Sequence, residues 1–247
     1  MPELILCGSG GWVPTRARET CCALVRRDEH ALLIDAGTGV SRLVEEPDLL
    51  RGVTRLDVVL THFHLDHVTG IGYLPALDLP EPPTIHAPGR WLYGTASRDI
   101  VGTLCSPPFL HVRPATVMRD VREYDDRGLD VGPFRLAARR QERHSGPTAA
   151  LRIDDEFVYC TDTALDADNA RFARGARVLL HEAWYAGPSQ RDDSHSSARD
   201  AAWVADAAEV ASLVLIHIHP HGDEAALLAD ASARFPGTAM GQDLRTH

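Results

Sequence analysis

The stretch that decides the fold is Thr61-His62-Phe63-His64-Leu65-Asp66-His67, which places three imidazoles and one carboxylate within six consecutive positions. It follows the mostly apolar run Leu56-Asp57-Val58-Val59-Leu60, which predicts a short β-strand. Residues that follow a strand lie on a loop, where several side chains can converge on one point. Imidazole nitrogens and carboxylate oxygens are ligands that divalent zinc, manganese and iron accept. The stretch therefore predicts a metal site rather than a solvated histidine-rich loop.

The spacing within this cluster favours two metal ions over one. His62 and His64 are two positions apart, so one loop can supply both to a single ion. Asp66 and His67 would turn toward a second ion. The cofactors expected from the sequence are therefore two divalent cations, with Zn2+ as the first choice and Mn2+ or Fe2+ as alternatives.

Two further ligands are expected at strand ends in the second half of the chain. His144 follows the strand-like run 134–138 and would complete the ligands of the first ion with His62 and His64. Asp162 follows the run 156–161, where a carboxylate with two oxygens can bridge both ions. A single residue of this kind is more often a cap or a satisfied core residue, so the prediction depends on the whole set.

The last ligand comes from a histidine-rich segment near the end of the sequence. His217 directly continues the apolar run 213–216 and would join Asp66 and His67 on the second ion. His219 and His221 are rivals that the residues alone do not exclude, although we expect His219 at the rim of the site. His86 also ends a strand-like run but has no evident partner nearby, so we interpret it as structural.

A second pair of residues suggests chemistry rather than metal binding. Glu182 follows His181 at the end of an apolar run, and His195 opens a helix-like stretch. A carboxylate that orients an imidazole, which then donates a proton or holds an anionic oxygen, is a common catalytic pairing. The alternative is a helix N-cap made by Ser194 or Ser196, with His195 incidental.

Composition narrows the classes of partner and compartment. The chain has 247 residues, 44% of them hydrophobic, and no apolar run approaches the roughly 20 residues that span a bilayer. Its start lacks a secretory signal, so we expect a cytoplasmic protein without a membrane partner. The formal net charge of −10 opposes binding to extended nucleic acid. The cysteines are interpreted as buried free thiols: Cys7, Cys21, Cys22, Cys105 and Cys160.

One basic run departs from this acidic character. Residues 135–143 contain four arginines and lead into His144. The run is interpreted as the solvated face of an edge strand, with a phosphate-guiding rim as the alternative.

The pattern along the chain predicts a single domain over residues 1–247. Strands are predicted at 3–7, 21–26, 31–35, 56–60, 84–87, 134–138, 149–153, 156–161, 178–181 and 212–217. Helices are predicted at 41–46, 91–104, 196–209 and 223–234. These elements favour two sheets packed face to face with helices outside. Residues 105–128 receive no assignment or role.

Motifs across most of the chain resemble the metallo-β-lactamase superfamily, and within it the ribonuclease Z-like phosphodiesterases. The resemblance is carried by a glycine-rich opening at 6–15, an Asp-Gly turn at 34–39, a His-x-His-x-Asp-His signature, a His-Glu-Ala step at 181–183 and a His-Ser-Ser step at 195–197. It implies an α+β fold, a four-layer αββα sandwich with a dinuclear metal site at one edge of the sheets. The metal ligands it implies are His62, His64, Asp66, His67, His144, Asp162 and His217.

The resemblance also implies supporting roles and leaves a homodimer open, because relatives often dimerise. Asp35 would support the site without binding metal, and Glu182 and His195 would be catalytic accessories. Bacterial ribonuclease Z enzymes carry an RNA-clamping arm between the third metal histidine and the bridging aspartate. Here His144 and Asp162 are only 18 positions apart, which leaves room for a hairpin alone. The sequence therefore favours a small anionic phosphodiester, such as a cyclic nucleotide, over transfer-RNA 3′ processing.

The leading functional prediction is a metal-dependent hydrolase acting as a phosphodiesterase. Two cations would lower the pKa of a shared water from about 15.7 toward 7, so that a metal-bridging hydroxide attacks phosphorus. Asp66 or Asp162 would accept the remaining proton of the water. His195 and an arginine from 139–143 would stabilise the developing charge.

Two other functions remain as alternatives. The same site could hydrolyse a carboxylic ester, lactone, thioester or sulfate ester, because a fold does not fix its chemistry. A non-catalytic metal-binding module would be expected to lack ligands, and none is missing here.

Overall fold

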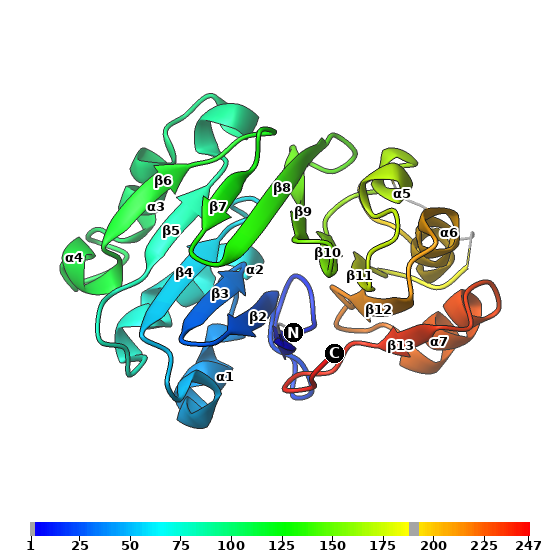
Figure 1. Cartoon of the computed structure of the whole chain (residues 1–247), viewed down its shortest axis with the longest axis horizontal. Helices are drawn as coiled ribbons and strands as arrows, with labels where there is room; N and C mark the ends of the chain where they lie inside the picture. The colour runs from blue at the N-terminus through cyan, green and yellow to red at the C-terminus, as the bar shows by residue number, and fades with distance from the viewer. Residues whose placement is uncertain (1–2, 188–192) are drawn as a thin grey trace.

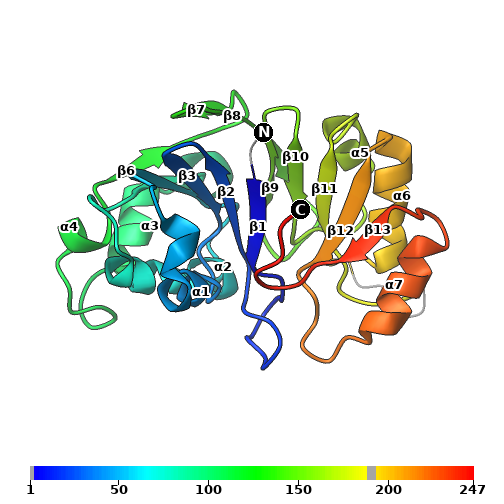
Figure 2. The ribbon, with the colours of Figure 1, turned by 60° about the horizontal axis from the view of Figure 1, so that its bottom comes forward.

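Two β-sheets pack face to face, and helices cover the outer face of each sheet (Figure 1). The computed structural model describes residues 3–187 and 193–247. Figure 2, turned by 60°, separates the layers, with α1 to α4 on one side of the sheets and α5 to α7 on the other. The four-layer αββα arrangement predicted from the sequence is therefore confirmed.

The first sheet has the strand order β1-β2-β3-β4-β5-β6. Its strands are β1 (Glu3–Gly8), β2 (Cys22–Arg27), β3 (His30–Ile34), β4 (Arg55–Val59), β5 (Thr84–Ala87) and β6 (Asp120–Glu123). The pairs β1–β2 and β2–β3 are antiparallel, and the pairs from β3 to β6 are parallel. The carboxyl ends of β3 and β4 therefore lie side by side.

The second sheet has the strand order β13-β12-β11-β10-β9-β8-β7. Its strands are β7 (Leu129–Val131), β8 (Phe134–Gln141), β9 (Thr148–Ile153), β10 (Phe157–Cys160), β11 (Val178–Glu182), β12 (Ser212–Ile216) and β13 (Thr238–Met240). Pairing is antiparallel from β7 to β10 and parallel from β10 to β13. The carboxyl ends of β10, β11 and β12 consequently share one edge.

Helices of different length cover the two outer faces. The first sheet is followed by α1 (Val40–Glu45), η1 (Pro47–Leu50), α2 (Leu65–Val68), η2 (Thr69–Ala76), the π-helical turn η3 (Gly89–Tyr93), α3 (Ser97–Leu104) and α4 (Pro114–Val117). The second sheet is covered by α5 (Asp168–Phe172), α6 (Ala198–Ala208) and α7 (Glu224–Ser232). Within the described residues, no helix is both long and apolar enough to cross a membrane.

The interface between the sheets is a continuous apolar layer. Leu6 and Ile34 from the first sheet and Tyr159, Leu180 and Val214 from the second belong to one buried cluster. Two further clusters fill the spaces between each sheet and its helices. Because the central strands are buried on both faces, their sequences are almost uninterrupted apolar runs, and this is why they were predictable.

The sequence of the alanine-rich helix α6 explains both where the helix begins and how closely it packs on the second sheet. Ser197 caps it, because the Ser197 hydroxyl accepts from the Asp200 amide while the Asp200 carboxylate accepts from the Ser197 amide. Such a capping box satisfies amide donors that a helix start leaves unpaired. Ala201, Ala202 and Ala205 are fully buried, so the helix packs closely against the second sheet.

The predicted strands agree with the structure, and the strands that were not predicted are short. Each of the ten predicted strands has a counterpart, but β6, β7 and β13 were not predicted. β6 reads Asp-Val-Arg-Glu and lies at a sheet edge, so it lacks an apolar pattern. The helix predicted over 91–104 was wrong as a single element, because Gly94 adopts φ 69° and separates η3 from α3. The unassigned segment 105–128 contains α4 and β6.

The C-terminal segment returns to the first sheet. The Leu244 amide donates to the Leu6 carbonyl, and the His247 amide donates to the Leu4 carbonyl. The Asp243 carboxylate accepts from the Ser9 amide and hydroxyl. The C-terminal segment thus lies beside β1 and holds it together with the glycine-rich loop that follows it (Figure 2).

His86 is structural, as predicted, although the structure gives it a partner that sequence reasoning missed. His86 Nε2 lies 3.0 Å from Asp57 Oδ1, and His30 Nε2 lies 2.9 Å from Asp57 Oδ2. The Asp57 carboxylate is fully buried. Burial opposes its charge, but the hydrogen bonds from His86 and His30 outweigh burial and lower the pKa of Asp57 to about 2.

We expect Asp57→Ala to reduce the free energy of unfolding by about 3 kcal/mol, because two histidines would lose a buried acceptor. Since the pKa of Asp57 lies below the unfolded value of about 3.9, its contribution is complete above that pH and is lost as pH falls toward 2. Urea unfolding at pH 7 and at pH 3 should therefore give a smaller difference between variant and wild type at pH 3.

Asp155→Ala is the control for this prediction, because the Asp155 side chain is 98% exposed. It should change the free energy of unfolding by less than about 0.5 kcal/mol. Equal losses in the two variants would contradict the role assigned to Asp57.

Candidate metal centre

All seven predicted metal ligands lie at one edge of the two sheets. They are supplied by the loop after β4 and the helix α2 (His62, His64, Asp66 and His67), the loop between β8 and β9 (His144), and the residues that follow β10 and β12 (Asp162 and His217). The strand ends turn sharply there, since Asp162 and His217 both have φ 52° and Asp35 has φ 58°. Such left-handed backbone costs free energy in non-glycine residues and is concentrated at functional sites.

The first group of ligands surrounds one oxygen of Asp162. His144 Nε2 lies 3.4 Å from Asp162 Oδ1, and His62 Nε2 lies 3.9 Å from the same atom. His64 Nδ1 is 3.3 Å from His144 Nε2. Ligand atoms of His62, His64, His144 and Asp162 all lie within 4.8 Å of one another.

The second group surrounds the other oxygen of Asp162. His67 Nε2 lies 3.0 Å and His217 Nε2 3.3 Å from Asp162 Oδ2. Asp66 Oδ2 is 3.3 Å from His217 Nε2 and 3.6 Å from His67 Nε2. The two oxygens of Asp162 therefore face two different sets of donors, which is the arrangement predicted for a bridging carboxylate.

Unsatisfied nitrogen atoms indicate that the donors suit a cation. His62 Nε2 and His67 Nε2 are buried and have no hydrogen-bond partner. His67 Nε2 is close to Asp162 Oδ2 but does not meet it with hydrogen-bonding geometry. Buried nitrogens rarely remain unpaired in native proteins, and a divalent cation would use their lone pairs.

The pKa shifts of the histidines reflect the electrostatic surroundings of the two ligand groups. Burial lowers the pKa of His62 and His64, which favours the neutral form that binds metals. Burial also opposes protonation of His217, but Asp162 and other nearby groups outweigh it and raise the pKa to about 10. The second group therefore has a strongly negative potential, which attracts cations.

Hydrogen bonds behind the ligands hold their orientation. Asp35 Oδ2 lies 2.8 Å from His67 Nδ1, and Asp35 Oδ1 accepts from the Thr61 amide. The Trp12 amide donates to Asp66 Oδ2 at 2.7 Å. Such partners fix the ring nitrogen that faces a metal. Asp35 thus supports His67, in the position that the sequence resemblance implied.

Two glycines are required by close approach to the ligands. A Cβ on Gly11 would lie 2.6 Å from the His217 ring. A Cβ on Gly37 would lie 2.2 Å from the Asp66 carbonyl oxygen. Any side chain at these positions would displace a ligand, which gives the glycine-rich opening and the Asp-Gly turn a physical reason.

Glu182 and His195 form the pair predicted from the sequence. His195 Nδ1 lies 2.8 Å from Glu182 Oε2, and Glu182 Oε1 accepts from the Thr163 amide. Burial opposes protonation of His195, but Glu182 raises its pKa. The helix cap is Ser197 rather than Ser194 or Ser196, and the His195 ring points away from that role toward Glu182.

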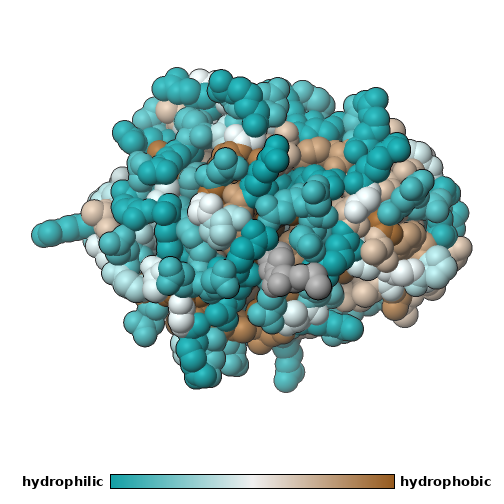
Figure 3. Space-filling view, viewed as in Figure 1, coloured by the Kyte–Doolittle hydropathy of each residue, from teal (hydrophilic) through white to brown (hydrophobic). Residues whose placement is uncertain are grey.

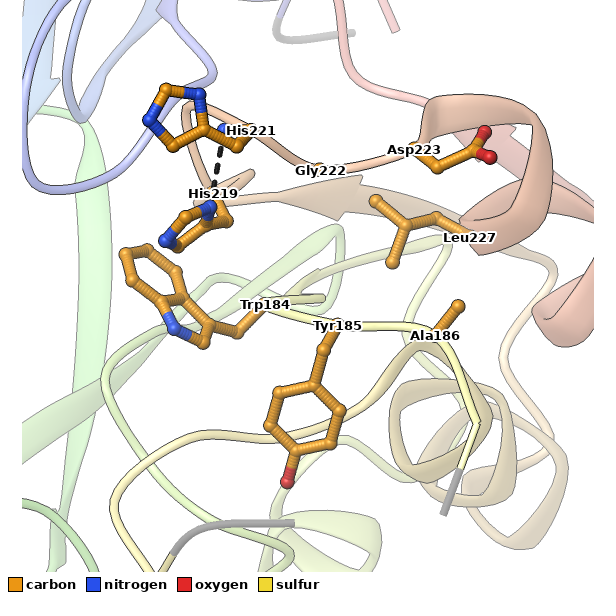
Figure 4. Close-up of a pocket in the computed structure, with 8 residues that line it drawn as sticks. All are labelled: Trp184, Tyr185, Ala186, His219, His221, Gly222, Asp223 and Leu227. Atoms are coloured by element: carbon orange, nitrogen blue, oxygen red, sulfur yellow. Dashed lines mark hydrogen bonds between the residues drawn. The ribbon is translucent and has the colours of Figure 1, made fainter. Parts of the chain in front are cut away.

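The rim histidines and the basic run are not among the grouped ligands. His219 Nδ1 accepts from the His221 amide, and its ring meets Trp184 edge to face at 4.6 Å (Figure 4). The basic run was predicted to lie on an edge strand, but β8 lies between β7 and β9. No arginine from 139–143 is among the described residues that line the cleft over the ligand groups. Arg139 binds Asp166 and Asn169, Arg140 binds Glu142 and the Trp91 carbonyl, and Arg143 binds the Leu165 carbonyl.

Trp184 is a site residue that sequence reasoning missed. Its ring stacks on the rings of His195 and His217, with distances between ring centroids of 4.4 Å and 5.1 Å. It lines a cleft of about 220 Å³ over the metal groups and an adjoining cavity of about 570 Å³. The adjoining cavity is also lined by Tyr185, Ala186, His219, His221, Gly222, Asp223 and Leu227 (Figure 4). The available signal was an aromatic residue directly after the His-Glu-Ala step.

Residues 30–218 match the beta-lactamase superfamily domain. The chain belongs to this superfamily. It is 31% identical to ribonuclease Z of Mycobacterium sp. (strain KMS) over 276 aligned positions, which include 99% of this chain and 95% of that protein. As a member of the metallo-β-lactamase superfamily with this donor set, the protein is a metal-dependent hydrolase.

Solved structures agree on the metallo-β-lactamase fold. The fold protein YhfI from Bacillus subtilis superposes with a TM-score of 0.81 at 20% identity, covering 100% of this chain and 99% of that one. A diphosphatase from the PhnP family superposes with a TM-score of 0.75 at 15% identity, covering 100% of this chain and 97% of that one. At these identities the likeness establishes the fold alone.

Asp162→Ala should abolish binding of both cations, because Asp162 is the one residue whose oxygens face both ligand groups within the described site. We expect the zinc content of the purified variant, measured by mass spectrometry, to fall from about two ions per chain to well below one. Asp166→Ala is the control, since Asp166 lies on the same loop but binds Arg139. Full zinc content in Asp162→Ala would contradict this assignment.

Proposed function

We propose that the protein is a phosphodiesterase that uses two divalent cations, most suitably Zn2+, to hydrolyse a small anionic phosphodiester such as a cyclic nucleotide. The observation that carries the proposal is the cleft of about 220 Å³ over Asp162, bordered by His195 and directly above both ligand groups. Its size suits a phosphodiester group and a compact substituent.

The connection between His144 and Asp162 supports a small substrate. It consists of the hairpin β9–β10, whose strands pair from Leu151 with Tyr159 to Ile153 with Phe157. The alignment with the mycobacterial ribonuclease Z is longer than the 247 residues of this chain, so that relative contains residues with no counterpart here. A chain without such insertions offers less surface to a large RNA.

Charge supports the same substrate class. Arg139 and Arg140 are paired with carboxylates, and Arg143 is bound to a carbonyl oxygen. Figure 3 shows hydrophilic side chains over most of one face, and the formal net charge is −10. The net negative charge would repel a polyanion, whereas a small ester meets mainly the local potential of the metal centre.

The residues have separate tasks in the proposed reaction. His62, His64 and His144 would hold one cation, Asp66, His67 and His217 the other, with Asp162 shared. When bound, the cations supply Lewis acidity and a nucleophile at neutral pH. Asp66 would accept a proton at Oδ2, which the Trp12 amide also orients.

His195 would act on the leaving group. Glu182 accepts from His195 Nδ1 and favours the doubly protonated ring, so Nε2 can donate a proton to the departing oxygen. Trp184 fixes the plane of that ring by stacking on it. The adjoining cavity beyond Trp184 provides room for the leaving group (Figure 4).

A substrate panel tests the proposed reaction. Bis-p-nitrophenyl phosphate should be hydrolysed faster than p-nitrophenyl acetate or p-nitrophenyl sulfate by the zinc-loaded protein, because two cations stabilise a phosphoryl transition state best. Release of p-nitrophenol measures each rate. A higher kcat/KM for the acetate or the sulfate would replace the phosphodiesterase with the corresponding ester hydrolase.

Transfer-RNA 3′ processing is the second candidate, because the chain is 31% identical to a protein named ribonuclease Z. The same panel should include a precursor transfer RNA with a 3′ extension and a 2′,3′-cyclic nucleotide. We expect turnover of the cyclic nucleotide and little cleavage of the RNA. Efficient cleavage at the 3′ end of the acceptor stem would favour RNA processing instead.

His195→Ala should lower kcat for the phosphodiester by about 100-fold with a smaller change in KM, because proton donation acts in the transition state. His111→Ala is the matched control, since His111 is exposed. Zinc content should be unchanged in both variants. If His195→Ala keeps wild-type kcat, the role of the Glu182–His195 pair is wrong.

A further inference from the structure

One cysteine differs from the other four in its surroundings. All five lie in the described part of the chain and are buried free thiols, as the sequence predicted. Cys7, Cys22 and Cys105 belong to the hydrophobic cluster beneath α1 and α3, and Cys160 belongs to the cluster beneath α6. Cys21 is fully buried but belongs to no hydrophobic cluster.

Cys21 instead faces the second group of metal ligands. Its Sγ atom and nitrogens of His67 and His217 all lie within 4.8 Å of one another. His67 Nε2 in the same group is buried and has no hydrogen-bond partner. A buried thiol beside two buried imidazoles is a set of soft and borderline donors that suits zinc.

The backbone holds Cys21 in this position. The Gly37 amide donates to the Cys21 carbonyl at 2.8 Å, and Gly37 itself packs against the Asp66 carbonyl. The Cys21 thiol donates to the Gly10 carbonyl oxygen at 3.5 Å, in the glycine-rich loop that also contacts the His217 ring through Gly11. The thiol is therefore placed by the same two turns that place Asp66 and His217.

We propose that Cys21 is a thiolate ligand of the second cation, in addition to Asp66, His67, Asp162 and His217. This inference rests on the proposed two-cation site. Binding would replace the S–H bond with a sulfur–metal bond and release the proton to solvent. The sequence predicted a buried free thiol at Cys21 rather than a metal ligand, because Cys21 is not part of a Cys-x-x-Cys pair.

A thiolate at this position has a consequence for metal choice. Soft sulfur ligands favour zinc and cobalt over manganese and magnesium, which prefer oxygen ligands. The first group offers nitrogen and oxygen donors only, whereas the second would add sulfur. The second position should therefore exclude manganese more strongly than the first.

Cobalt spectroscopy tests the proposal without relying on activity. The metal-free full-length protein is titrated with Co2+, and the near-ultraviolet spectrum is recorded for a thiolate-to-cobalt charge-transfer band. We expect this band in wild type, its loss in Cys21→Ser, and its retention in Cys22→Ser. Cys22 is the matched control because it is adjacent, equally buried and packed in the apolar core. Zinc affinity of the second position should fall by about tenfold or more in Cys21→Ser alone.

The outcomes separate this inference from the proposed function. Two bound cobalt ions without a charge-transfer band in wild type would overturn the role of Cys21 and leave the two-cation site intact. A band that persists in Cys21→Ser would also overturn it. Failure of wild type to bind cobalt would overturn the two-cation site and the thiolate with it. Because the wild-type spectrum is decisive by itself, poor folding of a variant does not remove the test.

Discussion

The contact of one carboxylate with two groups of imidazoles is the interaction on which the site depends. Asp162 is buried, and its oxygens lie 3.0 to 3.4 Å from the nearest nitrogens of His67, His217 and His144. Those histidines lie 73 to 150 positions apart in sequence, so only the packing of the two sheets brings them together. The apolar layer between the sheets therefore has a direct role in the chemistry, because it fixes the distance between the two sets of strand ends.

The sequence was sufficient to predict the fold and the convergence of the candidate ligands, because both follow from simple patterns. Strands such as β4 and β12 are buried on both faces, so they read as apolar runs, and a polar residue at their end marks the edge of the sheet. His62, Asp162 and His217 each occupy such a position. The convergence of the ligands was thus predictable from strand ends, while their roles as ligands remain predictions to be measured.

The features that sequence reasoning missed arise from contacts between distant segments. The partnership of Asp57 with His86 and His30 depends on the parallel register of β3, β4 and β5. The arginines of β8 look like an anion-binding rim in sequence, but their carboxylate and carbonyl partners come from other elements. Cys21 and Cys22 are adjacent and chemically identical, yet alternation along the chain places them in different environments. None of these distinctions is encoded by residue type alone.

Trp184 lines both the cleft over the ligand groups and the adjoining cavity. Metal binding and substrate selection would therefore depend on different residues on either side of its ring. The predicted metal ligands come from strand ends and the loops next to them, whereas the adjoining cavity is lined by residues such as Ala186, His221 and Leu227, which belong to neither ligand group. Substitutions that enlarge, narrow or recharge this cavity can accumulate without disturbing the cation-binding core. The evolutionary divergence of substrate preference within such a scaffold would then proceed mainly on the far side of a single indole ring.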